Sequence, residues 1–171
     1  MKRIAAGALI ATCLMIVGAA ATSTLIPDIA GVYKHRFENH YVDGEGGAYQ
    51  SEDSLEIAQV DDTHAYFSVH LDFLNGHECN IAGVARLEAD RLVYTPHLEP
   101  GDYACTLALA HEDDAVVLHD IDSGCLITFC GMRGSFEGAA FPLSWRQRIR
   151  YMWRLRMSQG YRAALREAGL R

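Results

Sequence analysis

The chain has 171 residues, half of them hydrophobic, and a formal net charge of −7 at pH 7. This length suits one domain with a proper core, and the hydrophobic fraction excludes a disordered chain. The acidic balance argues against nucleic acid as a partner, because phosphate groups would be repelled.

The first residues predict a targeting signal. A basic start and an apolar run end in Ala19 and Ala21, which occupy the −3 and −1 positions of a small-residue cleavage site. We therefore expect residues 1–21 to be a signal peptide and the mature chain to begin near Thr22, in the periplasm or outside the cell. The alternative is a retained membrane anchor, since residues 4–21 are just long enough to span a bilayer.

Residues 22–144 predict a β domain of short alternating strands separated by polar turns. The clearest strand is 64–73, in which apolar and polar side chains alternate. Others are expected at 31–37, 54–60, 79–87, 91–95, 104–110 and 115–121, with an eighth within 126–137. Tight turns alternate with longer loops, so antiparallel strands would gather all the long loops at one end. We expect a mainly β fold, an antiparallel eight-stranded meander forming a small barrel or sandwich, and we favour the barrel because closure removes exposed edges.

Four cysteines remain after the signal: Cys79, Cys105, Cys125 and Cys130. An even number in an exported chain predicts two disulfides. In a straight strand the α-carbons of Cys125 and Cys130 would stand about 16 Å apart, whereas a disulfide needs about 4.4–6.8 Å. A turn would permit that bond. We favour Cys79–Cys105 with Cys125–Cys130, because a straight eighth strand would carry Cys130 away from any partner; the other two pairings remain open.

Residues 145–171 form a basic tail that holds eight arginines and one glutamate, whereas residues 22–144 hold twenty-one acidic and five basic residues. Its apolar spacing predicts a helix, although the first half also alternates like a strand. The tail either contacts an anionic membrane or folds back onto the acidic barrel, and the charge match favours folding back. The residues expected to make either contact are Arg148, Arg150, Trp153, Arg154 and Arg156.

No motif of a hydrolase, a zinc protease, a phosphate loop or a calcium loop is present. Nothing assembles a nucleophile, a base and an oxyanion site, so we expect a protein that is not an enzyme and needs no cofactor. His64 and His70 share a strand face with Asp72, but the two histidines are about 20 Å apart. That is too far for one ion, and we expect a solvated outer face and no metal site.

The acidic loops are the best candidate for a partner-binding site. The predicted topology gathers their carboxylates at the long-loop end, where a focused negative potential would attract a cationic partner. The alternative is that these side chains only keep the protein soluble. The expected partner-binding residues are Asp43, Glu45, Glu78, Glu99, Asp102, Asp120 and Asp122, with Asp72 nearby.

The segment "CLITFCGMRGSFEG" (125–138), preceded by acidic hairpins and the other two cysteines, resembles small exported bacterial proteins grouped with lysozyme inhibitors. The resemblance implies a periplasmic β-protein that blocks a cell-wall hydrolase by inserting loop residues into its active cleft. It matches no blocking motif residue by residue, so it implies no inhibitory residue.

These patterns predict a non-enzymatic binding protein of the bacterial cell envelope that engages a basic protein such as a peptidoglycan hydrolase. One alternative is a lipocalin-like carrier of a small apolar ligand, with room in the barrel beside Gly83, Ala85, Ala108 and Ala110. Another is an envelope scaffold held at the membrane by its basic tail.

Overall fold

A computed structural model describes residues 24–41 and 47–170 of the chain. The predicted signal peptide and two of the predicted binding residues, Asp43 and Glu45, lie outside this part. Within it, no helix is both long enough and apolar enough to cross a membrane.

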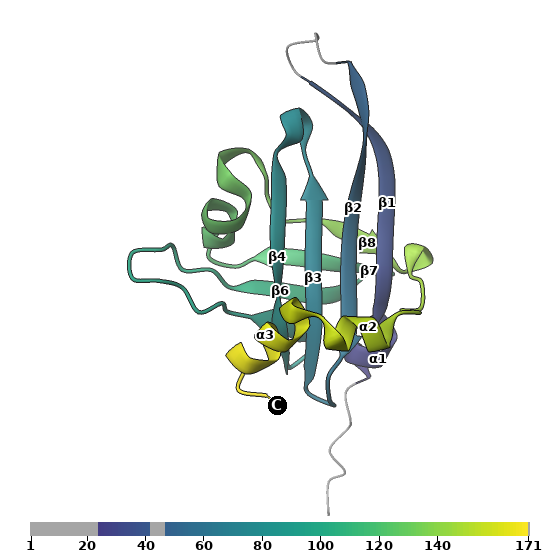
Figure 1. Ribbon diagram of the computed structural model, residues 1–171, viewed down its shortest axis with the longest axis vertical. Helices are drawn as coiled ribbons and strands as arrows, with labels where there is room; N and C mark the ends of the chain where they lie inside the picture. Colours follow the sequence, from purple (N-terminus) through teal and green to yellow (C-terminus); the bar gives the residue numbers. More distant parts are fainter. Residues whose placement is uncertain (1–23, 42–46, 171) are drawn as a thin grey trace, which may run out of the picture.

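Eight antiparallel strands form one sheet, and each strand pairs with the next along the chain. They are β1 (Gly31–His40), β2 (Ala48–Gln59), β3 (His64–Asp72), β4 (Glu78–Glu88), β5 (Arg91–Tyr94), β6 (Leu107–Glu112), β7 (Ala115–Asp120) and β8 (Ala140–Pro142). The long strands β1 to β4 stand upright in Figure 1, and β6 to β8 cross behind them. This confirms the predicted meander.

The meander is nearly closed into a barrel. The described strand β8 pairs with β7 and not with β1. The segment that follows it completes the circle: Val32 in β1 and Gln147 exchange two backbone hydrogen bonds of 2.8 Å each. The beginning of the basic tail therefore contributes one bridge to the nearly closed barrel.

Seven short helices accompany the strands in the described part. They are α1 (Leu25–Ile29), η1 (Leu74–Gly76), the π-helix η2 (Leu126–Cys130), η3 (Gly131–Arg133), η4 (Leu143–Trp145), α2 (Met152–Met157) and α3 (Gln159–Glu167). Helix α1 contributes Leu25, Ile26 and Ile29 to the core inside the barrel.

Side chains fill the barrel interior. Tyr33, Phe67, Phe136 and Phe141 are among the largest fully buried residues. The hydroxyl of Tyr33 donates a 2.6 Å hydrogen bond to the carbonyl of Ile29, and burial raises the pKa of Tyr33 to about 12 against the charge of Arg146. The interior is packed and its buried hydroxyl is paired.

The small residues on the strands do not leave space inside the barrel. A side chain at Gly83 would come within 2.3 Å of the ring of Tyr94, which packs edge-on against Phe67. Ala108 and Ala110 alternate with buried Leu107 and Leu109, so they belong to the outer face. The expectation that these alanines line a cavity was wrong.

The eighth strand was predicted within 126–137, but it lies at Ala140–Pro142. The intervening segment is helical because a buried carboxylate starts it. Asp120 accepts hydrogen bonds from the backbone N–H groups of Cys125, at 3.2 Å, and Leu126, at 2.9 Å. Backbone N–H groups that are already paired in this way are unavailable for a strand ladder.

The favoured disulfide pairing was also wrong: the bonds are Cys79–Cys130 and Cys105–Cys125. The prediction bonded Cys125 to Cys130 through a curled segment, because a straight strand would have carried Cys130 to the far end of the barrel, away from any partner. The helical segment instead keeps both of its cysteines at the long-loop end. Cys130 reaches Cys79 at the start of β4, and Cys125 reaches Cys105 just before β6.

The tail folds back over the outer face of the barrel, with α3 lying against β3 and β4 (Figure 1). Leu155, Tyr161 and Ala164 form an apolar cluster with Tyr66 and other sheet residues. Tyr66 is therefore buried rather than solvated, and burial raises its pKa.

The tail docks mainly through apolar contacts. No ion pair among the described residues involves an arginine of the tail. Tyr151 donates a 3.3 Å hydrogen bond to Glu56, whose pKa is raised by burial and lowered in part by that bond. The predicted helix begins only at Met152. Before it, Gln147 forms an isolated bridge with Val32 of β1, and residues 150 and 151 form a turn.

Candidate functional site

Two long loops, residues 95–106 and 121–139, lie against each other beside the Cys105–Cys125 disulfide. The backbone N–H of Ile121 donates a 3.0 Å hydrogen bond to the carbonyl of Thr106. A side chain at Gly124 would lie 1.6 Å from the carbonyl oxygen of Ala104, so only glycine allows this approach. The two loops are therefore held backbone to backbone.

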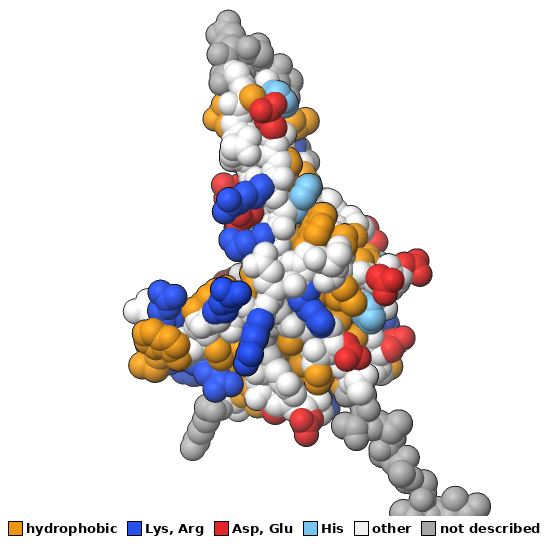
Figure 2. Space-filling view, turned by 90° about the vertical axis from the view of Figure 1, so that its right-hand side faces the viewer, with side chains coloured by type: hydrophobic (Ala, Val, Ile, Leu, Met, Phe, Trp, Pro, Cys, Tyr) orange, Lys and Arg blue, Asp and Glu red, His pale blue; other side chains and the backbone are white. Residues whose placement is uncertain are grey.

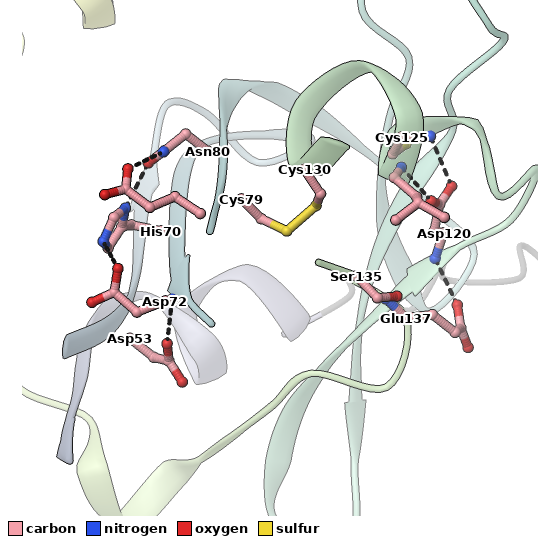
Figure 3. The surroundings of a disulfide bond; sticks show 12 residues. Asp53, His70, Asp72, Cys79, Asn80, Asp120, Cys125, Cys130, Ser135 and Glu137 are labelled. Carbon is pink, nitrogen blue, oxygen red and sulfur yellow. Dashed lines mark hydrogen bonds and ion pairs between the residues drawn. A yellow bond between two sulfur atoms is a disulfide. The ribbon is translucent and has the colours of Figure 1, made fainter. Parts of the chain in front are cut away.

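Acidic side chains hold the second loop through backbone hydrogen bonds. Figure 3 shows the carboxylate of Asp120 directed at the first turn of η2, while Glu137 accepts a 2.8 Å hydrogen bond from the backbone N–H of Asp120. Ser135 accepts a 3.0 Å hydrogen bond from the backbone N–H of Glu137. Asp120 is only 6 % exposed, so its carboxylate holds the loop and is not available at the surface.

Three large apolar side chains of the two loops are exposed. Tyr103 is 59 % exposed, Ile121 51 % and Ile127 46 %. Tyr103 comes two residues before Cys105, and the two isoleucines lie on either side of Cys125 in the chain. The Cys105–Cys125 disulfide therefore joins the loop segments that carry these three residues. Exposed apolar side chains on rigid loops are typical of a surface that binds another molecule.

Exposed carboxylates accompany these apolar side chains. Glu99 and Asp102 lie on the first loop, where the Asp102 carboxylate accepts a 3.1 Å hydrogen bond from the backbone N–H of Glu99. Asp122 lies on the second loop beside Ile121. We call residues 99–106 with 121–127 the acidic loop pair.

The remaining predicted residues fall elsewhere. Glu78 lies at the start of β4, where it forms a second cluster with His70 and Asp72 at the end of β3. The predicted acidic end is thus divided into the acidic loop pair and this histidine–carboxylate cluster.

Hydrogen bonds and charges define the histidine–carboxylate cluster. His70 Nδ1 lies 2.7 Å from Asn80 Oδ1, and His70 Nε2 lies 3.1 Å from Asp72 Oδ1 (Figure 3). Burial works to lower the pKa of His70, but the bond with Asn80 and the charges of Asp72 and Glu78 raise it above its ordinary value. Burial raises the pKa of Asp53 beside them, against a hydrogen bond from the N–H of Asp72.

Sequence reasoning missed this cluster because it compared residues along one strand. The usable signal was a hairpin pattern, His-x-Asp before the connection at 73–77 and Glu-x-Asn after it. Antiparallel register places such residues directly opposite one another. The structure pairs His70 with Asn80 and Asp72 with Glu78.

The fold and its surface define a class: an antiparallel eight-stranded barrel, crosslinked by two disulfides, that presents rigid acidic loops. No protein-family model matches the chain, and neither the curated proteins nor the solved structures include a match to it. The resemblance to lysozyme inhibitors therefore stays a prediction.

Proposed function

We propose that this protein is a non-enzymatic binding protein of the bacterial cell envelope, and that its acidic loop pair engages a basic protein such as a lysozyme-type peptidoglycan hydrolase. The observation that carries the proposal is the exposure of Tyr103, Ile121 and Ile127 on two crosslinked loops that also bear carboxylates. Apolar and aromatic anchors supply most of the affinity of an interface. The surrounding charge selects and steers a cationic partner.

Rigidity supports the same proposal. Loops that are already ordered lose little conformational freedom on binding, so more of the contact energy appears as affinity. The disulfide, the backbone contact at Gly124 and the buried Asp120 all restrict the loop pair before a partner arrives.

Two further observations bear on location and on the alternatives. Disulfides persist in oxidising compartments such as the periplasm, which supports the predicted export of residues 22–171. The filled barrel interior, with Tyr33, Phe67 and Phe136 fully buried, favours a protein-binding surface over a carrier of a small apolar ligand.

We expect the double substitution Asp102→Asn/Asp122→Asn to slow association with a basic lysozyme several-fold at low salt and to reduce the salt dependence of that rate, because steering depends on these charges.

Tyr103→Ala should mainly speed dissociation, with about a tenfold loss of affinity, as expected for an anchor worth more than 1 kcal/mol. Binding kinetics and residual hydrolase activity are the measurements.

The matched control is Asp113→Asn/Asp114→Asn, which removes the same charge from the exposed turn between β6 and β7. Asparagine tolerates the left-handed backbone of both positions. Equal effects of the two double substitutions would show that only the net charge matters. A panel of basic hydrolases that neither binds nor loses activity would refute the proposed partner class.

A second candidate function, contact with an anionic membrane through the tail, is favoured by one patch on α2. Trp153 is 70 % exposed and Met157, one turn later, 64 % exposed. The Arg154 guanidinium lies 5.8 Å from the centre of the Trp153 ring. Figure 2 shows this apolar patch bordered by basic side chains. Arg148 and Arg156 also line a surface groove of about 880 Å³ that includes Ile149 and Met152.

We expect Trp153→Ala to lower, severalfold, the cosedimentation of the protein with vesicles that contain anionic lipid. An aromatic ring inserted into the lipid interface contributes part of the membrane affinity. Tyr103→Ala, which removes an exposed ring from the acidic loop pair, should leave vesicle binding unchanged. Equal binding to neutral and anionic vesicles, or equal losses in both variants, would contradict membrane contact by the tail.

A further inference from the structure

We propose that His70, Asp72 and Glu78 bind a transition-metal ion such as Zn²⁺ at the outer end of the β3–β4 hairpin. The inference is independent of the proposed partner. Sequence reasoning expected no metal site because it considered His64 as the second ligand. In the structure the third group near His70 and Asp72 is Glu78 from the neighbouring strand, and not His64.

The hairpin register brings the ligands together. His70 and Asp72 are two residues apart on β3, and they stand directly opposite Asn80 and Glu78 on β4. Residues two apart on a strand share a face, and directly opposed residues are close neighbours. Four polar side chains therefore converge on one patch of the sheet without any loop being involved.

The donor atoms are close to a metal-binding arrangement. His70 Nε2 and Asp72 Oδ1 are 3.1 Å apart, and one ligand atom from each of the three residues lies within 4.8 Å of the others. Ligand atoms around a tetrahedral zinc ion stand about 3.4 Å apart, given metal–ligand distances near 2.1 Å. Glu78 is exposed, so a rotation of its side chain closes the remaining gap.

A second layer of hydrogen bonds orients each ligand. Asn80 Nδ2 donates to the Glu78 carboxylate at 3.2 Å, which leaves Asn80 Oδ1 to accept from His70 Nδ1. When the neutral imidazole carries its proton on Nδ1, Nε2 is the nitrogen whose lone pair can bind an ion, and it lies 3.1 Å from Asp72 Oδ1. The backbone N–H of Glu52 fixes the other oxygen of Asp72, at 2.9 Å.

One face of the cluster is open. His70 and Asp72 also line a surface groove of about 530 Å³, together with Arg36 and Ser54. An ion has an entry path there, and water can fill the fourth position. One imidazole and two carboxylates suit zinc and its neighbours in the first transition series better than Ca²⁺ or Mg²⁺, which prefer oxygen ligands alone.

The test is titration of the mature, oxidised protein with Zn²⁺ by calorimetry, and with Co²⁺ by its visible absorption. We expect one ion per chain and a thermal midpoint that rises with Zn²⁺ and falls back with a chelator. His70→Ala and Asp72→Asn should each weaken binding at least tenfold. Asn80→Ala, which removes the orienting side chain and no ligand, should weaken it about tenfold or more.

His64→Ala is the matched control. His64 lies on the same strand and pairs with a single carboxylate, Asp61, at 3.0 Å. This variant should bind Zn²⁺ like the parent protein. Equal losses from His64→Ala and His70→Ala would overturn the site, as would saturation that needs millimolar Zn²⁺ or Co²⁺ spectra that do not change in the Asp72→Asn variant. Circular dichroism of each variant confirms that it folds.

Discussion

Replacement of Cys79 and Cys130 by alanine should lower the free energy of unfolding by about 4 kcal/mol, the largest loss expected from removing either crosslink. The bond closes a loop of 51 residues, and a crosslink restricts the unfolded chain more as its loop grows. It also ties the start of β4 to η2, and the other disulfide does not join these two elements. Urea unfolding of the oxidised protein measures the change.

The matched comparison is the Cys105→Ala/Cys125→Ala variant. That bond closes 20 residues, so its loss should lower the free energy of unfolding by about 3 kcal/mol. It should also weaken partner binding, because the acidic loop pair is no longer crosslinked, whereas the first variant should keep most of that binding. A nonreducing digest that links Cys79 to Cys105 would contradict the pairing from which both expectations follow.

The second large effect is expected at Gly124. Alanine there places a methyl group 1.6 Å from the Ala104 carbonyl oxygen. The backbone at Gly124 and the backbone at Ala104 are each next to a cysteine of the Cys105–Cys125 disulfide, which holds them together. Overpacking of this kind destabilises by about 1–3 kcal/mol and occasionally more; we expect the upper end, since no flexible side chain can move aside. Chemical unfolding and partner-binding kinetics should both register the separation of the loops.

Gly160→Ala is the control with the opposite sign. Gly160 lies in α3, and a side chain there meets nothing within 4 Å. Alanine has the higher helix propensity, so this variant should gain up to about 1 kcal/mol. A Gly124→Ala protein as stable as the parent would show that the loops are not in contact.

The disulfide-linked loop surface and the histidine–carboxylate cluster are two distinct candidate binding sites on different elements of the barrel. The acidic loop pair offers apolar anchors among negative charges, which suits a folded cationic protein. The cluster at the end of β3 and β4 offers three ligand groups to an ion. Separate variants test each, because Tyr103 and His70 share no contact with one another in the described structure.

Strands with one buried face were predictable from sequence because alternation marks that face. Strand 64–73 matches β3 to within one residue, and its apolar side chains lie in the core. The hairpin of β1 and β2 extends further than predicted, to His40 and back from Ala48. Its outer part carries mostly polar residues, and Asn39 and Tyr49 there donate hydrogen bonds to the carbonyl of Phe73, so hydrogen bonds support it without a hydrophobic pattern.

The candidate sites were only partly predictable. Glu99, Asp102 and Asp122 lie on the loops where the meander places them, because loop position follows from strand order. Nothing in the sequence indicated that Tyr103, Ile121 and Ile127 would be exposed together, since exposure depends on how two distant loops pack. The Glu78 partner of His70 required the register of a hairpin, which alternation alone does not specify.

Periodicity and turn residues are local signals, and they were enough to predict the strand order, the antiparallel meander and the end of the barrel that holds the cysteines. Which cysteines bond, where the eighth strand lies and what the tail covers became clear only from the folded chain. Each of these depends on contacts between distant segments: the Asp120 carboxylate with the η2 backbone, Gln147 with Val32, and Leu155 with the outer face of the sheet. Such contacts depend on packing and hydrogen bonding in three dimensions, which the local pattern of residues does not specify.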